Sequence, residues 1–297
     1  MQMIKRIGLF LLTNILVVVT VGIAWSLISH FLGLKAVNSN MVGLLIWCSL
    51  FGFTGAFVSL LMSKMMAKWM LGLRIIDPRT SDPTFSGLVY RIHELAKRAG
   101  LPKPPEVAIY DSEDVNAFAT GPSKSNSLVA VSTGLLRSMN ENEVDGVLGH
   151  EIAHIANGDM VTMTLITGVV NTFAMFFSRI LANLISSQVD EKFRYVVHIV
   201  VVILGDILFT ILGSMVVNYY SRRREFRADL GGAQFSSRSN MVAALRRLQQ
   251  VHEIPSEDRD MLATMKISNR HKGGLMALFM THPALEDRIK ALEKARI

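Results

Sequence analysis

The stretch from Gly149 to Asp159 contains residues whose types and spacing could bind a metal ion. His150 and His154 are four positions apart, so on a helix their side chains lie on one face, one turn from each other. Two imidazoles at this spacing supply half of a tetrahedral zinc site. Glu151, directly after the first histidine, could accept a proton from a metal-bound water. This H-E-x-x-H arrangement is typical of zinc-dependent hydrolases.

The residues around this stretch predict that it is a packed helix. A solvated polar helix with two hydrogen-bonded histidines would show the same spacing. Asn140 and Glu143, however, form the sequence pattern of an N-cap box. Apolar residues then recur at helical spacing; they are Val144, Val147, Leu148, Ile152 and Ile155. This context favours a metal site over the solvated helix.

A catalytic zinc site needs three protein ligands and an open position for water. Some zinc enzymes place a third histidine six residues after the second, but that position is Met160. The single cysteine, Cys48, lies in an apolar stretch, so neither an intrachain disulfide nor a cysteine-based metal site is possible. The third ligand must therefore come from elsewhere in the chain.

The best candidate for the third ligand is Glu225. Glu225 and Asp229 are again four residues apart. One carboxylate could bind the metal, and the other could accept the second N–H of a ligand histidine and so fix its tautomer. The alternative is that Glu225 is a solvated residue beside three arginines. Glu253, Asp258 and Asp260 are rivals by residue type only, in a polar stretch.

Long uncharged segments indicate a membrane protein. Half of the 297 residues are hydrophobic and the formal net charge is +7. Ile7 to Leu34 and Ala36 to Ser63 contain no Asp, Glu, Lys or Arg, and about 20 such residues suffice to span a bilayer. The first run is too long for a cleaved signal peptide. Much of the basic charge flanks the apolar runs and no nucleic-acid signature is present, so we expect no nucleic-acid partner.

A second apolar hairpin is predicted over residues 160–221, either spanning the bilayer or deeply embedded. Its arms are Met160–Ser178 and Tyr195–Ser221, and Arg179 is expected in the turn beyond the first arm. Lysines and arginines flank both hairpins on one side, which places the N-terminus and the soluble parts in the cytoplasm. Asp206 is unusual in an apolar arm. It could be functional, but we favour an ion pair with Arg179.

The predicted fold class is a mainly α membrane protein with transmembrane helical hairpins and an α+β domain that carries a small sheet. Residues 1–63 form an N-terminal hairpin, and residues 64–159 contain an interfacial segment, the sheet and the metal-binding helix. Residues 160–221 form the second hairpin, and residues 222–297 carry the third ligand and C-terminal helices. The strand candidates are Val107–Tyr110, Asn116–Ala119 and Leu128–Val131.

The segments Gly149–His154 and Ser221–Asp229, with the flanking hairpins, resemble HtpX-type membrane zinc metalloproteases over essentially the whole chain. These are gluzincins related to the CAAX prenyl endopeptidases. The resemblance implies a thermolysin-like catalytic core and one zinc ion per chain. By this resemblance the metal ligands are His150, His154 and Glu225. Glu151 is the general base, and Asp229 is the partner of a ligand histidine.

The resemblance also implies an enzyme of the bacterial cytoplasmic membrane that hydrolyses misfolded or damaged membrane proteins at the cytoplasmic face, in the stress response. Its partners would be polypeptide substrates and the lipid bilayer. Asn116, Ala117, Phe118 and Ala119 are similar to an edge strand that pairs with extended substrate, although an ordinary strand is the alternative. His282 is a candidate to stabilise an oxyanion, although a capping or surface histidine is equally compatible with the sequence.

Two other functions fit parts of the pattern. An intramembrane protease would bury the H-E-x-x-H helix in lipid, but acidic residues flank it; they are Glu141, Glu143, Asp145 and Asp159. A membrane scaffold or holdase with a structural zinc would have a closed fourth position and no chelator-sensitive proteolysis. Because a membrane hairpin is inserted between the second and third ligands, we expect the metal close to the cytoplasmic bilayer surface, with loops or tails of membrane proteins as substrates.

Overall fold

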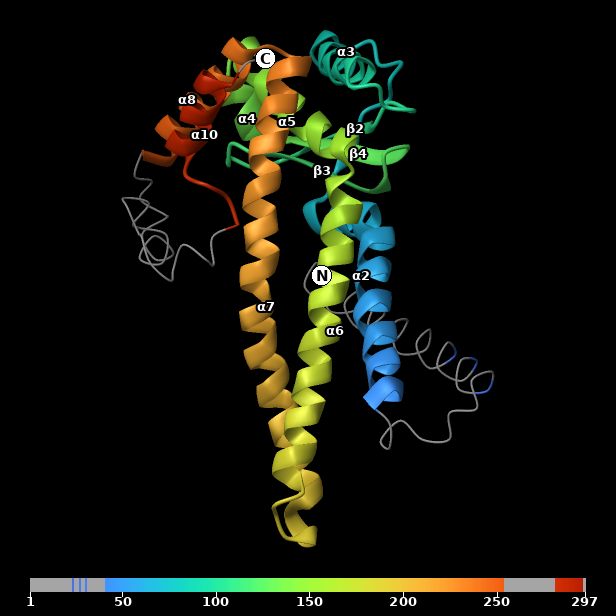
Figure 1. Cartoon of the computed structure of the whole chain (residues 1–297). Helices are drawn as coiled ribbons and strands as arrows, with labels where there is room; N and C mark the ends of the chain where they lie inside the picture. Colours follow the sequence, from blue (N-terminus) through green and yellow to red (C-terminus); the bar gives the residue numbers. More distant parts are fainter. Residues whose placement is uncertain (1–22, 24–26, 28–29, 31–40, 254–280, 296–297) are drawn as a thin grey trace. The chain divides into compact units, whose positions relative to one another are not determined.

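The computed structural model describes residues 41–253 and 281–295, together with residues 23, 27 and 30. The chain divides into two compact units. The helical unit comprises Met1–Leu61 and Thr162–Tyr219, and the mixed unit comprises Met62–Val161 and Tyr220–Ile297. Figure 1 labels the helices and strands. The predicted span over residues 7–34 lies outside the described residues, apart from residues 23, 27 and 30.

In the part of the helical unit that the structure describes, three long helices are present, α2 (Met41–Leu71), α6 (Asp159–Ser186) and α7 (Glu191–Phe235). Each is long and apolar enough to cross a membrane, with mean hydropathy over its most apolar window of 2.0, 1.7 and 2.5. The apolar parts of α6 and α7 lie side by side and are joined by the turn at residues 187–190 (Figure 1). The predicted fold class, membrane-type helices plus a small sheet, is therefore confirmed.

An ion pair links the two helices of this hairpin. Arg179 Nη1 lies 2.8 Å from Asp206 Oδ1, and the guanidinium also lies 5.6 Å from the ring centroid of Trp47 on α2. The predicted pairing of Asp206 is confirmed. The predicted position of Arg179 in the turn is wrong, because α6 continues to Ser186. A paired arginine is tolerated inside an apolar helix, so its charge does not mark the helix end.

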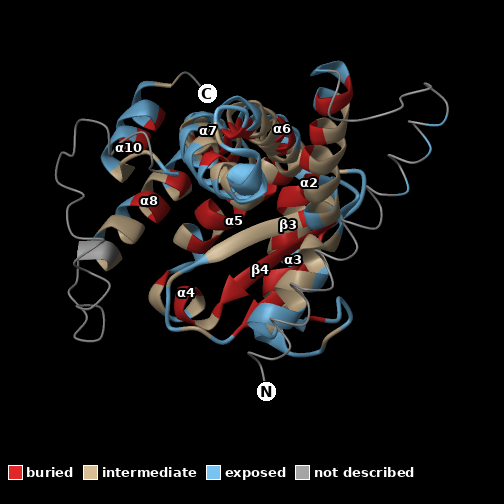
Figure 2. Cartoon of the chain, turned by 90° about the horizontal axis from the view of Figure 1, so that it is seen from below, coloured by how far each residue is buried: buried red, intermediate tan, exposed pale blue. Residues whose placement is uncertain are grey.

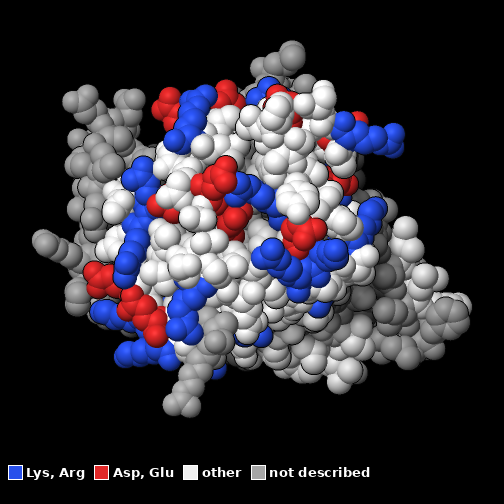
Figure 3. Space-filling model, turned by 90° about the horizontal axis from the view of Figure 1, so that it is seen from above, with Lys and Arg blue, Asp and Glu red and all other residues white. Residues whose placement is uncertain are grey.

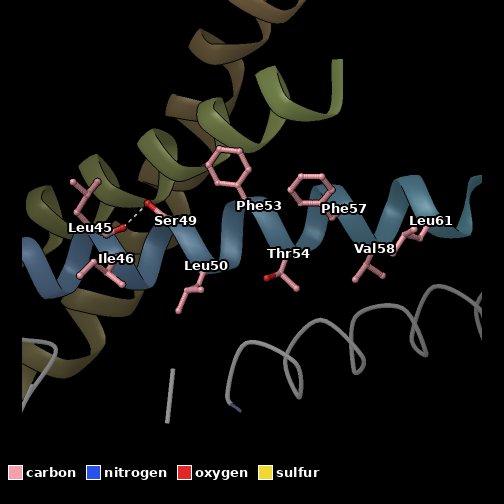
Figure 4. Close-up of a pocket in the computed structure, with 9 residues that line it drawn as sticks. All are labelled: Leu45, Ile46, Ser49, Leu50, Phe53, Thr54, Phe57, Val58 and Leu61. Atoms are coloured by element: carbon pink, nitrogen blue, oxygen red, sulfur yellow. Dashed lines mark hydrogen bonds between the residues drawn. The ribbon is translucent and has the colours of Figure 1, made fainter. Parts of the chain in front are cut away.

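A groove of about 610 Å³ runs along α2 and is lined by side chains between Leu45 and Leu61 (Figure 4). Ser49 is one of its few polar residues, and its hydroxyl donates to the carbonyl of Leu45 at 2.8 Å. The lining contains no carboxylate, imidazole or thiol. The described residues of this groove are therefore almost entirely apolar.

The mixed unit contains a four-stranded sheet with the order β1-β2-β4-β3. Its strands are β1 (Arg74–Ile75), β2 (Glu106–Tyr110), β3 (Ala117–Ser123) and β4 (Asn126–Ser132). β2 and β4 are parallel, and the two outer pairs are antiparallel. β4 is almost wholly buried while β3 is mostly half-buried (Figure 2). All three predicted strands are present; β1 was not predicted, because two residues show no alternation.

Helices α3 (Pro83–Arg98), α4 (Thr133–Ser138), α5 (Glu141–Asn157) and α8 (Arg238–Glu253) contribute residues to the main apolar core beside this sheet. Helix α10 (Leu285–Lys294) packs on α8 in a second, smaller cluster. α5 packs against α3, α8 and β3. Its apolar stripe, which includes Val144, Leu148 and Ile152, is buried with Ile92 of α3 and Val131 of β4 in one cluster. The predicted packing of the metal-binding helix is thus confirmed.

Several helix ends differ from the predicted boundaries. α2 continues past the predicted end of the apolar run to Leu71, because no breaker occurs before Gly72, which has φ 63°. α7 continues from the apolar arm through the three arginines to Phe235 without a break. α10 begins at Leu285, after Pro283 and the N-cap Ala284. Charge marks where a helix leaves an apolar environment, but it does not end the helix.

Basic and acidic side chains are interspersed on the face drawn in Figure 3. Several of them form exposed ion pairs between helices, such as Arg91 with Glu141 and Arg246 with Glu293. Exposed pairs of this kind typically contribute at most about 1 kcal/mol each. The apolar core, rather than surface charge, is therefore the main source of stability in the mixed unit.

Candidate metal centre

Three potential metal ligands from two helices meet in the mixed unit. His150 and His154 lie on α5, Glu225 lies on α7, and one ligand atom of each falls within 4.8 Å of the others. The two Nε2 atoms are 3.1 Å apart. Glu225 Oε2 is 3.5 Å from Nε2 of His150, and Oε1 is 3.4 Å from Nε2 of His154. The sequence-predicted ligands are therefore brought together. The side chains of Glu253, Asp258 and Asp260 lie outside the described part of the chain.

The spacing of these atoms fits a tetrahedral ion. Ligand atoms about 2.0–2.1 Å from a zinc ion at tetrahedral angles lie about 3.3 Å from one another, close to the three separations above. Glu225 is 1% exposed, and its Oε1 has no hydrogen-bond partner among the described residues. A buried carboxylate oxygen without a partner is costly. Two imidazoles and this oxygen are the donor set of catalytic zinc sites.

The local sequence explains how α5 presents its two histidines. Asn140 caps the helix, since its side chain accepts from the Glu143 N–H and the Glu143 carboxylate accepts from the Asn140 N–H. The predicted capping box is thus confirmed. Gly158, with φ 71°, ends the helix in the left-handed conformation that glycine adopts without strain. Both ends are fixed, so the ligand face cannot rotate freely.

Glycines allow α7 to approach α5 closely enough for the ligands to meet. A Cβ atom added to Gly232 would lie 2.9 Å from the backbone nitrogen of His150, and one added to Gly231 would lie 2.7 Å from Cβ of Ala153. Real Cβ atoms essentially never lie so close. Any larger residue would therefore separate the helices and move Glu225 away from the histidines.

Each ligand histidine has its own carboxylate behind it. His150 Nδ1 lies 2.9 Å from Asp229 Oδ1, and His154 Nδ1 lies 2.6 Å from Asp159 Oδ2. Both carboxylates are 1% exposed. A carboxylate at Nδ1 favours the tautomer that donates there, which leaves the Nε2 lone pair directed toward the metal position.

Asp229 contacts a predicted ligand histidine, as the sequence leads one to expect, whereas the contact of Asp159 with His154 was not predicted. Asp159 follows Gly158, the C-cap of α5, and begins α6. Residues five apart, such as His154 and Asp159, do not face each other on a continuous helix. The break at Gly158 allows the Asp159 side chain to contact the imidazole of His154. The Asn-Gly-Asp sequence at the end of the motif was the signal of this break.

The histidines hold protons tightly when no metal is bound. Burial disfavours the charged imidazolium, but the hydrogen bond to Asp159 and the nearby negative charge of Glu225 outweigh it and raise the pKa of His154 to about 9. The pKa of His150 is also raised, since its hydrogen bonds to Asp229 and Glu225 outweigh burial. Zinc binds neutral imidazole, so a metal ion must displace these protons.

We expect the zinc affinity of the metal-free protein to rise with pH up to about 9, the raised pKa of His154, and to level off above it. Each displaced proton contributes about a tenfold change per pH unit. Titration calorimetry at neutral pH in buffers with different ionisation enthalpies measures the protons released, and we expect at least one per zinc ion. A binding enthalpy that is the same in every buffer would contradict this prediction.

Glu151 lies beside the ligands but does not belong to the cluster of ligand atoms. Its Oε2 accepts a hydrogen bond of 2.8 Å from the backbone N–H of Ala119 on β3. The side chain is half-buried. β3 therefore holds the carboxylate of Glu151 next to the ligand face of α5, in a position where it could exchange protons with a bound water.

β3 lies at the edge of the sheet formed by the described strands. Phe118 pairs with Ala130, and Asn116 accepts at its carbonyl from the N–H of Ser132 at 3.0 Å. In an antiparallel ladder the residues between such pairs direct their N–H and C=O groups away from the neighbouring strand. Ala117 and Ala119 are these residues, and the bond from Ala119 to Glu151 has that direction. The edge facing α5 thus carries free backbone groups.

His282 also reaches the ligand cluster. Its Nδ1 lies 3.0 Å from Glu225 Oε2, and 61% of its side chain is exposed. The side chain therefore lies at the solvent side of the centre, in contact with a predicted ligand. His282 is thus a surface histidine that also contacts a buried carboxylate of the ligand cluster.

Comparisons with known proteins identify a peptidase family. Residues 85–296 match Peptidase family M48. The chain is 50% identical over 298 residues to "Protease HtpX homolog" of Bacillus pumilus (strain SAFR-032), which covers 97% of this chain and 99% of that protein. It is 50% identical over 289 residues to "Protease HtpX" of Pasteurella multocida (strain Pm70), which covers 97% of this chain and 98% of that protein.

A solved structure has a similar fold. The crystal structure of S. mikatae Ste24p matches with a TM-score of 0.63 and 18% sequence identity over 95% of this chain. The match covers 66% of that chain, so the present chain spans just under two thirds of its length. At this identity the similarity concerns the fold alone.

Proposed function

Because the chain belongs to peptidase family M48, as an HtpX-type membrane metalloprotease, we propose that it is a zinc-dependent endopeptidase of the bacterial inner membrane. Its substrates are misfolded or damaged membrane proteins, cleaved at the cytoplasmic face. The observation that carries the proposal is the convergence of His150, His154 and Glu225 on one point, with Glu151 beside them. Peptide hydrolysis needs such a metal position next to a proton acceptor.

His150, His154 and Glu225 would hold the zinc ion, which when bound supplies a Lewis acid and lowers the pKa of water. Glu151 takes a proton from the attacking water and passes it to the nitrogen of the scissile bond, so the amine leaves as the C–N bond breaks. The hydrogen bond from Ala119 holds the Glu151 carboxylate in place for both transfers. Asp229 and Asp159 keep the two imidazoles in the ligating tautomer.

We propose that β3 binds the substrate as an added strand. Ala117 offers an outward N–H and C=O, while the outward N–H of Ala119 is already occupied by Glu151. An extended peptide along this edge would receive backbone hydrogen bonds that do not depend on its side chains. Such binding suits a protease that must accept many damaged sequences. Asn116 and Phe118 direct their backbone groups to β4 and would support the strand.

The membrane location of the substrates follows from the order of the chain. The apolar parts of α6 and α7 lie in sequence between His154 and Glu225, and α7 itself carries Glu225. The positions of lysine and arginine favour a cytoplasmic catalytic domain and multiple passes through the inner membrane. We therefore propose loops or tails of membrane proteins on the cytoplasmic side as the preferred substrates.

Chelator-sensitive proteolysis is the test of this proposal. We expect the full chain, purified in detergent, to digest casein and an unfolded membrane protein. A chelator should reduce the rate to background, and about one equivalent of zinc per chain should restore it. A scaffold with a structural zinc would show no proteolysis with or without zinc, and that result would contradict the proposal.

Two variants in the same assay test the substrate contacts. Ala117→Pro removes an outward N–H without removing a ladder bond, so we expect a raised KM with little change in zinc content.

His282→Ala tests oxyanion stabilisation by His282, with an expected loss of about 10²–10³-fold in kcat. A variant with wild-type kinetics would reject the role assigned to that residue.

A further inference from the structure

Arg288 is a buried cation that the reaction described above does not use. It lies on α10, the C-terminal helix, and is 6% exposed. Its Nε lies 2.8 Å from Asp229 Oδ2 and its Nη2 lies 2.6 Å from Asp229 Oδ1. These two hydrogen bonds form the bidentate contact that a guanidinium makes with a carboxylate. Arg288 therefore fixes the plane of the Asp229 carboxylate.

The same carboxylate orients a predicted zinc ligand. Asp229 Oδ1 receives both Arg288 Nη2 and, at 2.9 Å, His150 Nδ1. Arginine only donates hydrogen bonds, so the 3.4 Å separation of Nη2 and Nδ1 is a contact between two donors on one acceptor. This arrangement keeps the proton of His150 on Nδ1 and leaves Nε2 for the metal. Arg288 Nη1 also lies 3.5 Å from Glu225 Oε2.

We propose that Arg288 is a positioning residue of the metal centre, which holds Asp229 so that His150 presents Nε2 to the ion. This inference rests on the proposed function, because it takes His150 as a zinc ligand. Arg288 also neutralises the charge of Asp229. The metal centre thus depends on three separate helices, α5, α7 and α10.

Contacts away from the centre hold α10 in place. Ile289 and Leu292 are buried in a cluster with Met241 and Leu245 of α8. Arg246 of α8 pairs with Glu293 at 3.0 Å on the surface. The apolar contacts therefore place α10, and Arg288 can be changed without removing them. Arg246 is the matched control, because it links the same two helices but does not touch the metal centre.

The test compares zinc affinity in full-length Arg288→Met, Arg288→Lys and Arg246→Met proteins, by competition with a chromogenic chelator. We expect Arg288→Met to bind zinc about 10–100-fold more weakly, as when a partner of a metal-binding histidine is lost, and to alter the ligand-field spectrum of bound Co²⁺. Lysine restores the charge but not the two-pronged contact, so Arg288→Lys should fall between Arg288→Met and wild type. Arg246→Met should match wild type in both measurements.

A double-mutant cycle shows whether Arg288 acts through Asp229. The double variant Arg288→Met/Asp229→Asn should have the same zinc affinity as whichever single variant binds zinc less tightly. Both substitutions interrupt the same contacts, from Arg288 through Asp229 to His150, so their effects should not add. Zinc affinity and a Co²⁺ spectrum equal to wild type in Arg288→Met, or in Arg288→Lys if the methionine variant does not fold, would overturn the proposal. Failure of the wild-type protein to bind zinc would instead refute the proposed function.

Discussion

Glu151→Gln should bind zinc as the wild-type protein does and lose proteolysis by about 10²–10⁴-fold in kcat, the usual contribution of a general acid–base residue. Glu151 lies beside the ligand cluster but outside it. Glutamine has the same shape, and its amide oxygen can still accept the hydrogen bond from Ala119. It cannot take the proton of the attacking water. The loss should therefore fall on catalysis, with metal binding and folding unchanged.

The measurement is kcat and KM with an unfolded protein substrate, together with zinc content per chain. Glu141→Gln is the matched control, because it makes the same chemical change on the same helix. Glu141 is exposed and pairs only at the surface with Arg91, so we expect kcat within about twofold of wild type, as surface pairs contribute little. If Glu151→Gln cleaves normally, another group accepts the proton and the role assigned to Glu151 is wrong.

Local spacing was sufficient to predict the parts of the site that lie on one helix. His150 and His154 share a face because they are four residues apart, and the same rule relates Glu225 to Asp229. The N-cap box of α5 was equally visible, since Asn140 and Glu143 are close in sequence. Contacts within one or two helical turns depend on geometry that every helix shares, so a sequence can reveal them.

Contacts between distant segments could not be predicted in the same way. Arg288 lies 138 residues after His150, and an arginine in a short charged helix normally indicates a solvated face. Its burial depends on how α10 packs against α8, which no periodicity shows. Asp159 was missed for a related reason, because the left-handed residue at Gly158 redirects the chain and changes the neighbours of His154.

Among the described residues, the apolar segments were predicted more reliably than the helix ends. Hydropathy reports which residues avoid water, whereas a helix ends where backbone hydrogen bonds or a breaker residue require it. α7 continues through Arg222–Arg224 to Phe235, so one helix carries both an apolar segment and Glu225. The domain boundary expected at residue 222 therefore lies within a continuous helix.

The third ligand provides the second large expected effect. Glu225→Gln should reduce zinc affinity by more than the roughly 10–100-fold expected for a residue that only orients a ligand, and proteolysis should fall to background. Glu225 supplies the only charged group among the three predicted ligands. A neutral amide oxygen is a much weaker partner for zinc than a carboxylate. Both Glu225→Gln and Glu151→Gln should be inactive, but only Glu151→Gln should retain the metal.

Zinc content after dialysis and the spectrum of bound Co²⁺ measure this difference. Asp229→Asn is the matched control, because it makes the equivalent acid-to-amide change one helical turn away on α7. We expect Asp229→Asn to weaken zinc binding by about 10–100-fold while one ion per chain still binds at saturating zinc. If Glu225→Gln keeps wild-type affinity, the third ligand is another residue, and His282, which contacts Glu225 at 3.0 Å, becomes the first candidate to replace it.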